Sequence, residues 1–382
     1  MKIVFDVSLL LGEQKTGVQF YTYNIIEQII KHENNEYLFN FFSLRRKKKK
    51  LQKLSPFLDK PNCRVQVCTF LNENLYNKIS KIITIPYSFC FNEKPQISHF
   101  WAFQLPHYVK GKKIITVYDM VYMAYPQTMA DNYKLMLESN VESSCNRADK
   151  IITISEFSKK EIINYLNINP DKIEVIPCGI DTNLFHPVQE KNTIEIVKEK
   201  YNVQGNYFLY LGTIEPRKNL VRLIQAYSIV NRKHNNIPKL VLAGGYGWKY
   251  EPIIQEVKNQ RLEKEVLFIN YVSNEDRVPL ICGAIGFLFP SLYEGFGLPP
   301  LEAMTCGIPV LTSNISSLPE VVGDAAIKID PLNVEEMADG IEQLLFNNEL
   351  RKTLIEKGIQ RSTCFSWEKS AKKLMEVYEN TL

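Results

Sequence analysis

The sequence predicts an α/β protein built from two Rossmann-like halves, each with a parallel sheet covered by helices. Apolar runs of strand length alternate with helical patterns along the whole chain, as in parallel sheets with crossover helices. The chain has 382 residues, 45% of them hydrophobic, which is enough for two ordinary cores. The alternation breaks at residues 183–205, a charged stretch containing Pro187. We therefore expect two halves with a cleft between them.

In the first half, the apolar run after Met1 is too short to cross a membrane and lacks a signal-type cleavage region, so it predicts a core strand. Helical patterns follow at residues 17–32 and 131–147. The expected strands of this half are residues 2–10, 36–44, 97–102, 113–122 and 150–155.

The second half repeats the pattern. Helices are expected at residues 219–232 and 252–260 and from Leu301 onward, and a last helix at 367–380 follows the completed sheet. The expected strands are residues 207–213, 239–245, 266–272, 286–291 and 308–313.

Charge and cysteine content exclude some classes of protein. The net charge is +4, with 24 Lys/Arg against 19 Asp/Glu in residues 1–190 and 22 against 23 afterwards. The eight cysteines form no CxxC pair, which favours reduced thiols in a cytoplasmic protein over disulfides or a zinc site.

Much of the basic charge of the first half lies in one block. The block consists of Arg45, Arg46, Lys47, Lys48, Lys49 and Lys50, with Lys53 close behind. It is either a solvated loop or a site of attraction to an anionic membrane, where each basic residue contributes ~1 kcal/mol. Nucleic-acid binding is disfavoured because no stacking aromatics interleave with the block.

The segment SLYEGFGLPPLEAM, residues 291–304, holds two carboxylates, Glu294 and Glu302, around a loop of glycines and prolines. The apolar run before it reads as a buried strand, so the loop leaves the carboxyl end of a strand, where α/β sheets bind ligands. A helix from Leu301 would place Glu302 in its first turn and leave backbone N–H groups facing a ligand. A strand-to-helix turn with two unrelated glutamates is the alternative.

A cationic turn follows the strand expected at residues 207–213. Arg217 and Lys218 stand at the start of the helix expected from Asn219. Two cations at a helix N-terminus oppose the helix dipole, which favours an anion site over a structural role. The anion indicated is a diphosphate.

Several segments together resemble retaining glycosyltransferases of family 4, which have the GT-B fold. The first is the pair of glutamates separated by seven residues around GFG. The others are YLGTIEPRKNLVRLIQAY, RADKIITISEFSKKEI, IEVIPCGIDTNLFHP and SNISSLPEVVGDAA, the last resembling the mannosyltransferase-like branch that builds bacterial polysaccharides. The resemblance implies an acceptor-side domain at 1–187, a nucleotide-sugar domain at 188–364, and a helix at 365–382 that returns to the first domain.

The resemblance also implies roles for single residues. Glu294 would bind the sugar and Glu302 the donor ribose, with Arg217 and Lys218 on the diphosphate. Backbone groups of Gly295, Phe296, Gly297 and Leu298 would complete the pocket, and Gly17 would let the N-terminal loop approach the donor.

One position departs from the family pattern. The family commonly has His-Asp where this chain has Tyr118 and Asp119. A tyrosine can still offer a hydroxyl to a sugar oxygen, but it cannot be a cation near neutral pH, so the histidine role is not carried over and a hydroxyl contact from Tyr118 stays open. Asp119 remains a candidate site residue at the end of its expected strand.

The function expected is a retaining, metal-independent transfer of a hexose from a nucleotide donor, with GDP-mannose as first choice, to a glycan or lipid-linked acceptor. No Asp-x-Asp occurs in the sequence, which disfavours a metal-held diphosphate, and no cofactor is expected. UDP- or dTDP-linked donors, a GT-B epimerase or phosphorylase and a non-enzymatic sugar-nucleotide-binding subunit stay open. The expected location is the cytoplasm, with peripheral contact at the inner face of the plasma membrane through the basic block.

Overall fold

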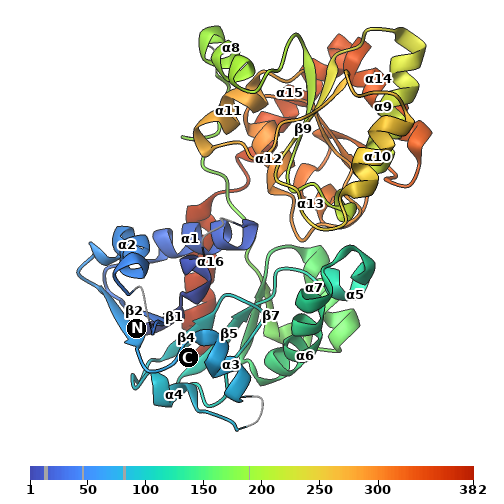
Figure 1. Ribbon diagram of the computed structural model, residues 1–382. Coiled ribbons are helices and arrows are strands. Elements are labelled where there is room, and N and C mark those ends of the chain that lie inside the picture. Colours follow the sequence, from blue (N-terminus) through green and yellow to red (C-terminus); the bar gives the residue numbers. More distant parts are fainter. Residues whose placement is uncertain (13–15, 45–46, 81–82, 189) are drawn as a thin grey trace. The chain divides into compact units, whose positions relative to one another are not determined.

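The computed structural model describes residues 1–12, 16–44, 47–80, 83–188 and 190–382. These residues divide into two compact units, which we describe separately (Figure 1). The first unit contains Met1–Tyr122, Asp131–Gly179 and Trp367–Leu382, and the second contains Met123–Ala130 and Ile180–Ser366. The domain boundary expected at residue 187 would place Met123–Ala130 in the first domain. The structure assigns this segment to the second unit.

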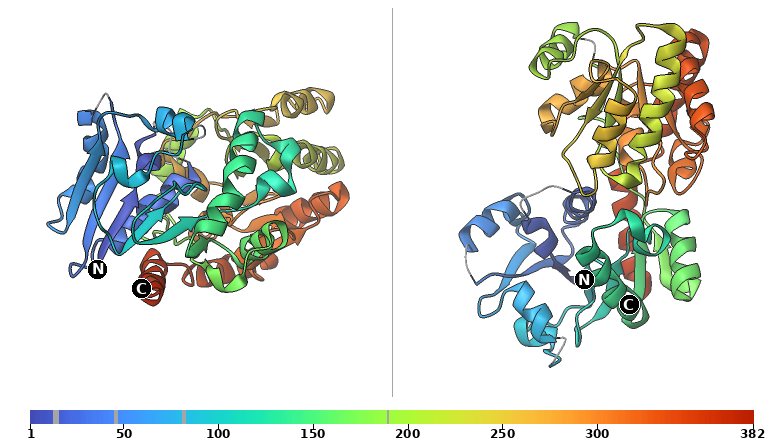
Figure 2. Two further views of the ribbon diagram at one scale, coloured as in Figure 1. Left: turned by 90° about the horizontal axis from the view of Figure 1, so that it is seen from below. Right: turned by 45° about the vertical axis from the view of Figure 1, so that its right-hand side comes forward.

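Within the described residues, the first unit has a seven-stranded parallel sheet in the order β3-β2-β1-β4-β5-β6-β7. Ile3, Val4 and Phe5 of the central strand are buried, because helices lie on both faces of the sheet (Figures 1 and 2). The strands are β1 (Lys2–Asp6), β2 (Glu36–Phe42), β3 (Cys63–Cys68), β4 (Ile97–Phe100), β5 (Lys112–Thr116), β6 (Lys150–Thr153) and β7 (Ile173–Val175).

The helix α1 (Gly17–Ile29) begins at a capping box. The Thr16 side chain accepts from the backbone N–H of Gln19, and the Gln19 side chain accepts from the N–H of Thr16, so two otherwise unpaired N–H groups are satisfied. The other helices from this part of the chain are α2 (Lys47–Leu58), α3 (Glu73–Ser80), α4 (Tyr87–Cys90), α5 (Val121–Ala124), α6 (Asp131–Arg147) and α7 (Glu156–Leu166).

The C-terminal helix α16 (Trp367–Thr381) belongs to the first unit, where it packs against α1 (Figure 1). The Trp367 ring lies 5.8 Å from the rings of Phe20 and Tyr21. The hydroxyl of Tyr378 lies 2.6 Å from Nδ1 of the buried His99. The apolar face of α16 therefore completes the core of the first unit.

The second unit has a six-stranded parallel sheet, within the described residues, in the order β10-β9-β8-β11-β12-β13. Its strands are β8 (Tyr207–Leu211), β9 (Lys239–Ala243), β10 (Val266–Phe268), β11 (Gly286–Phe289), β12 (Val310–Ser313) and β13 (Ala326–Ile329). Its helices are α8 (Lys191–Lys200), α9 (Leu220–His234), α10 (Glu251–Asn259), α11 (Asn274–Cys282), α12 (Leu298–Thr305), α13 (Leu318–Val322), α14 (Val334–Phe346) and α15 (Asn348–Ser362).

The segment Met123–Ala130 packs on the second unit through three contacts. The Tyr125 ring lies 5.7 Å from the Tyr293 ring. The indole N–H of Trp248 donates to the Thr128 carbonyl, and Lys249 Nζ donates to the Gln127 carbonyl at 3.0 Å. The segment therefore reaches the residue next to Glu294.

Most of the expected elements have somewhat different bounds in the structure, and three of the differences concern segments discussed below. The strand expected at 2–10 ends at Asp6 and is followed by a 3₁₀ turn, Ser8–Leu11. The strand expected at 113–122 ends at Thr116. The helix expected from Leu301 starts at Leu298, because Pro299 and Pro300 are tolerated in a first turn, whose N–H groups have no partner within the helix.

None of the helices in the described ranges is both long enough and apolar enough to cross a membrane.

Candidate active site

The candidate site of the second unit lies where the strand order of its sheet reverses, between β8 and β11. The chain leaves β8 toward Arg217 and Lys218 and leaves β11 toward Glu294. Because β8 and β11 are parallel neighbours, both loops leave the same edge of the sheet. In open α/β sheets, ligands usually bind at this edge, beside the point where the strand order reverses.

Four charged residues meet there, and we call them the charge cluster: Glu215, Arg217, Lys218 and Glu294. Lys218 Nζ lies 2.5 Å from Glu294 Oε1, and Arg217 Nη1 lies 3.0 Å from Glu294 Oε2. Arg217 Nη2 also lies 2.7 Å from Glu215 Oε1. The structure thus joins the predicted cations to the first predicted glutamate.

The cluster sets the charge state of Glu294. Burial by itself would raise the pKa of this carboxyl, but Arg217 and Lys218 outweigh burial and lower the pKa to about 2. Burial and the nearby Arg217 lower the pKa of Lys218 from its usual range, since Lys218 is only 7% exposed. Glu294 is therefore a carboxylate at neutral pH.

This pairing corrects one expectation about the cations. They lie in a 3₁₀ turn, Pro216–Lys218, that precedes α9, and not in the first turn of that helix. Both also contact carboxylates. With two cations and two carboxylates the cluster is close to neutral, so a bound diphosphate would share the cations with Glu294.

Asn219 holds the cationic turn against the end of β11. It adopts the left-handed conformation with φ 61°, and its Nδ2 donates to the carbonyls of Pro290 at 3.1 Å and Pro331 at 2.7 Å. The Leu292 N–H donates to the Arg217 carbonyl at 2.9 Å. The sequence pattern places Asn219 at a helix start, and asparagine is among the residues that adopt the left-handed conformation most readily.

Two serines hold the loop between the glutamates. Ser317 Oγ donates to the carbonyls of Glu294 at 2.8 Å and Phe296 at 2.7 Å, and the Glu294 N–H donates to Ser316 Oγ at 3.2 Å. Both serines lie in the segment SNISSLPEVVGDAA, but the sequence pattern alone indicates no role for either.

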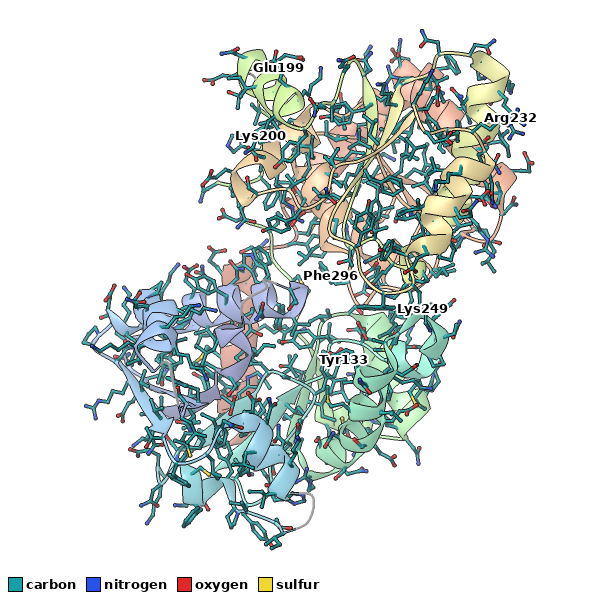
Figure 3. The ribbon with its side chains drawn as sticks, in the orientation of Figure 1. Tyr133, Glu199, Lys200, Arg232, Lys249 and Phe296 are labelled. Carbon is teal, nitrogen blue, oxygen red and sulfur yellow. The ribbon has the colours of Figure 1, made fainter. Side chains whose placement is uncertain are left out.

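The predicted loop residues Gly295, Phe296, Gly297 and Leu298 lie directly before and at the start of α12, and Phe296 is labelled in Figure 3. Gly297 has φ 119°, which other residues rarely adopt, and a Cβ there would lie 2.8 Å from Leu318. Phe296 is buried against Phe365, 5.6 Å away. The N–H of Glu294 donates to Ser316 Oγ and the prolines after Leu298 have no N–H, so neither adds to the donors expected from Gly295 to Leu298.

Glu302 lies on α12 and has surroundings different from those of Glu294. It is 2% exposed and pairs with Arg277 Nη2 of α11. Burial raises the pKa of Glu302, and Arg277 opposes that rise. The two glutamates of the motif thus have different partners, and sequence reasoning missed Arg277 because nothing in its local pattern marks it.

Two of the candidate residues, Gly17 and Asp119, lie in the first unit. Asp119 lies past the end of β5, where its Oδ1 accepts from the Val121 N–H at 3.1 Å. Gly17 begins α1, and a Cβ there would meet nothing within 4 Å, so its backbone does not require glycine. Residues 13–15 of the preceding loop lie outside the described residues.

Tyr118 faces the core of the first unit. It is 3% exposed, and its hydroxyl lies 2.9 Å from Thr22 Oγ1 of α1. Its ring stands edge-on to Tyr21 at 5.5 Å. The side chain of Tyr118 therefore contributes to the packing of α1 against the sheet of the first unit.

The comparisons with known proteins agree with this geometry. The model of Glycosyltransferase Family 4 matches residues 17–184, and that of Glycosyl transferases group 1 matches residues 192–361. The O-antigen chain mannosyltransferase B of Escherichia coli is 34% identical over 288 residues, which cover 75% of this chain and 74% of that relative. The chain belongs to glycosyltransferase family 4. The family predicted from the motifs is thereby confirmed.

Solved structures confirm the fold class of this family 4 protein. Sucrose-phosphate synthase from Thermosynechococcus elongatus matches with a TM-score of 0.75 and 19% identity, covering 99% of this chain and 98% of that one. The Anabaena protein HepE, in complex with UDP and glucose, matches with a TM-score of 0.73 and 16% identity over the full length of both chains. The GT-B fold and the hexosyltransferase class are as expected, which sets aside the non-enzymatic binding subunit.

Proposed function

We propose that this protein transfers mannose from GDP-mannose to a hydroxyl of a glycan or lipid-linked acceptor in cell-surface polysaccharide synthesis, with retention of configuration and without a metal ion. The Escherichia coli relative is an O-antigen chain mannosyltransferase, which supports mannose and polysaccharide synthesis. The observation that carries the proposal is Glu294, held as a carboxylate by Arg217 and Lys218 where the strand order of the second sheet reverses.

Arg217 and Lys218 would hold the diphosphate. As the bond between the sugar and the phosphate breaks, negative charge gathers on the leaving phosphate oxygen. Two cations fixed beforehand stabilise that charge without reorganisation. They supply the positive charge for which other transferases use a metal ion.

Glu294 would face the sugar, whose ring carbon becomes positively charged as the bond breaks. Each of its carboxylate oxygens is paired with a cation, and its pKa is low, so it is a weak nucleophile. We therefore assign it electrostatic stabilisation of the sugar. The acceptor hydroxyl would attack from the face that the phosphate leaves and pass its proton to the leaving phosphate oxygen, which retains the configuration.

Glu302 would bind the ribose of the donor. It lies eight residues after Glu294, on α12, and beside Arg277 instead of the cations of the charge cluster. This separation supports a division in which one glutamate serves the sugar and the other serves the nucleotide.

A donor screen tests the proposal. The full chain is incubated with a lipid-linked oligosaccharide and GDP-mannose, UDP-glucose or a dTDP-sugar, with and without EDTA. Nucleotide release, product mass and the anomeric configuration by NMR are measured. UDP-glucose is included because HepE was crystallised with UDP and glucose.

The expected product is an α-mannoside, formed from GDP-mannose at the same rate with EDTA. Turnover of UDP-glucose alone would replace the donor, and a β-product would overturn retention. Loss of activity in EDTA, restored by added metal, would overturn metal independence.

A further inference from the structure

The ion pair between Arg277 and Glu302 bridges two neighbouring helices of the second unit. Arg277 comes from α11 and Glu302 from α12. Glu302 is 2% exposed, whereas the side chain of Arg277 is 27% exposed. The guanidinium also lies 5.8 Å from the Phe185 ring. The arginine thus approaches a buried carboxylate from the solvent side.

Burial raises the pKa of Glu302, and Arg277 is the group that favours its charged form. Burial favours the neutral acid, and the interactions that oppose burial at this carboxyl both come from Arg277, through charge and a hydrogen bond. Helices α13 and α15 and strands β11 and β12 also pack on α12. None of their charged side chains, in the described ranges, acts on Glu302.

The other titratable group facing Glu302 is the thiol of Cys306, at the end of α12. Its hydrogen bond to Cys282 of α11, and then burial, raise the pKa of the Cys306 thiol. It therefore stays neutral and leaves Arg277 as the partner that balances the carboxylate.

Two polar atoms of the Arg277–Glu302 ion pair have no hydrogen-bond partner within the described residues. Arg277 pairs with Oε2 of Glu302, and Oε1 accepts no hydrogen bond from the described part of the chain. The Nε–H of Arg277 is buried and has no acceptor among the described residues. A buried donor without an acceptor is costly, and a bound hydroxyl group would remove that cost.

We propose that Arg277 is a positioning residue for the nucleotide: it keeps Glu302 ionised and orients it so that the carboxylate accepts hydrogen bonds from the ribose hydroxyls of the donor. This inference rests on the proposed ribose role of Glu302. An ionised carboxylate accepts hydrogen bonds on both oxygens, whereas the protonated acid loses acceptor capacity and the added strength of a charged acceptor. Arg277 then sets the pH range over which the ribose is recognised.

The experiment measures binding of GDP and 2′-deoxy-GDP to the full chain by calorimetry between pH 6 and pH 9. Wild type is compared with Arg277→Met, Arg277→Lys and Glu302→Gln. The matched control is Arg232→Met, an arginine on α9 that pairs with Gln260 and lies in another part of the second unit from Phe296 (Figure 3). Circular dichroism checks the fold of each variant.

Wild type and the control are expected to prefer GDP over 2′-deoxy-GDP by about tenfold at every pH, since one hydrogen bond to a charged group is worth at least that factor. Arg277→Met should lose the preference at the acidic end of this range, because loss of Arg277 favours the neutral form of the buried Glu302, and regain it toward pH 9. Arg277→Lys should keep it, because the charge is restored. Glu302→Gln should weaken it at every pH.

The outcomes separate the two claims. Equal binding of both nucleotides by wild type would overturn the ribose role of Glu302, and the inference with it. A preference that depends on Glu302 but is independent of pH in Arg277→Met would overturn the inference alone. A uniform loss in Arg277→Met that lysine does not rescue would also overturn it, since Arg277 would then only support the structure.

Discussion

Glu294 stays ionised far below neutral pH because Arg217 and Lys218 contact its two oxygens. At the scale of single residues, the chemistry of the protein depends on how these three side chains share their charges. A bound diphosphate would add negative charge to a cluster that is already balanced, so each cation is expected to matter for turnover.

Lys218→Ala is predicted to lower donor turnover by about 100-fold, because a preorganised charge contact to the leaving group is worth ~3 kcal/mol in the transition state. Nucleotide release at saturating donor measures this. The control is Lys233→Ala, whose lysine pairs with Glu342 on the surface and should leave turnover unchanged. Near-normal turnover in a folded Lys218→Ala protein would remove this residue from the site.

Substitutions of Glu294 and Glu302 are predicted to change different kinetic constants. Glu294→Gln should lower kcat, since its charge matters most when the sugar is positively charged. Glu302→Gln should mainly raise the donor KM, because ribose contacts are made equally in the ground and transition states. Steady-state kinetics with varied donor separates the two, and an effect of both variants on KM alone would contradict the role given to Glu294.

Tyr118→Phe is predicted to change stability and leave the rate alone. Thr22 Oγ1 donates to the Val18 carbonyl at 2.9 Å, so the tyrosine hydroxyl donates to Thr22. Removing this buried donor should cost ~1 kcal/mol of unfolding free energy, measured by urea denaturation. A fall in kcat with unchanged stability would return Tyr118 to the site.

At the scale of elements, α2 carries what the structure describes of the basic block. Arg45 and Arg46 lie outside the described residues. Lys48 and Lys49 are exposed, whereas Lys50 Nζ donates to the Phe42 carbonyl at 2.7 Å and Lys53 Nζ to the Leu11 carbonyl at 3.0 Å. The helix therefore combines lysines that hold the fold with lysines that face solvent.

Replacing Lys48 and Lys49 with Gln is predicted to weaken binding to anionic vesicles by roughly 30-fold at low salt, because each lysine near such a surface contributes ~1 kcal/mol. Vesicle sedimentation measures this, and donor hydrolysis in solution should not change. The control replaces the exposed Lys94 and Lys112. Equal binding by wild type and the α2 variant would leave the block as a solvated helix.

At the scale of the whole molecule, neither unit consists of one continuous stretch of the chain. Met123–Ala130 belongs to the second unit, and Trp367–Leu382 belongs to the first. Trp367 is 3% exposed and Tyr378 is fully buried, so the core of the first unit contains side chains from the far end of the chain.

Trp367→Ala is therefore predicted to destabilise the first unit by ~3–5 kcal/mol through lost burial and a cavity. Hydrogen exchange should show faster exchange in α1 and β1 and little change in β8 and β11. Leu382→Ala, at an exposed terminal position, is the control. Faster exchange confined to the second unit would contradict the assignment of α16.

The sequence alone predicts the fold class, the family and most of the strands, because alternating apolar runs and short motifs are local properties. It also determined that Glu294 follows one strand and Arg217 and Lys218 another. It did not determine that these cations are neutralised by Glu215 and Glu294, that Arg277 faces Glu302, or that Tyr118 points toward Thr22. Those contacts join residues far apart in the chain, and only the packing of parallel strands and their helices brings such residues together.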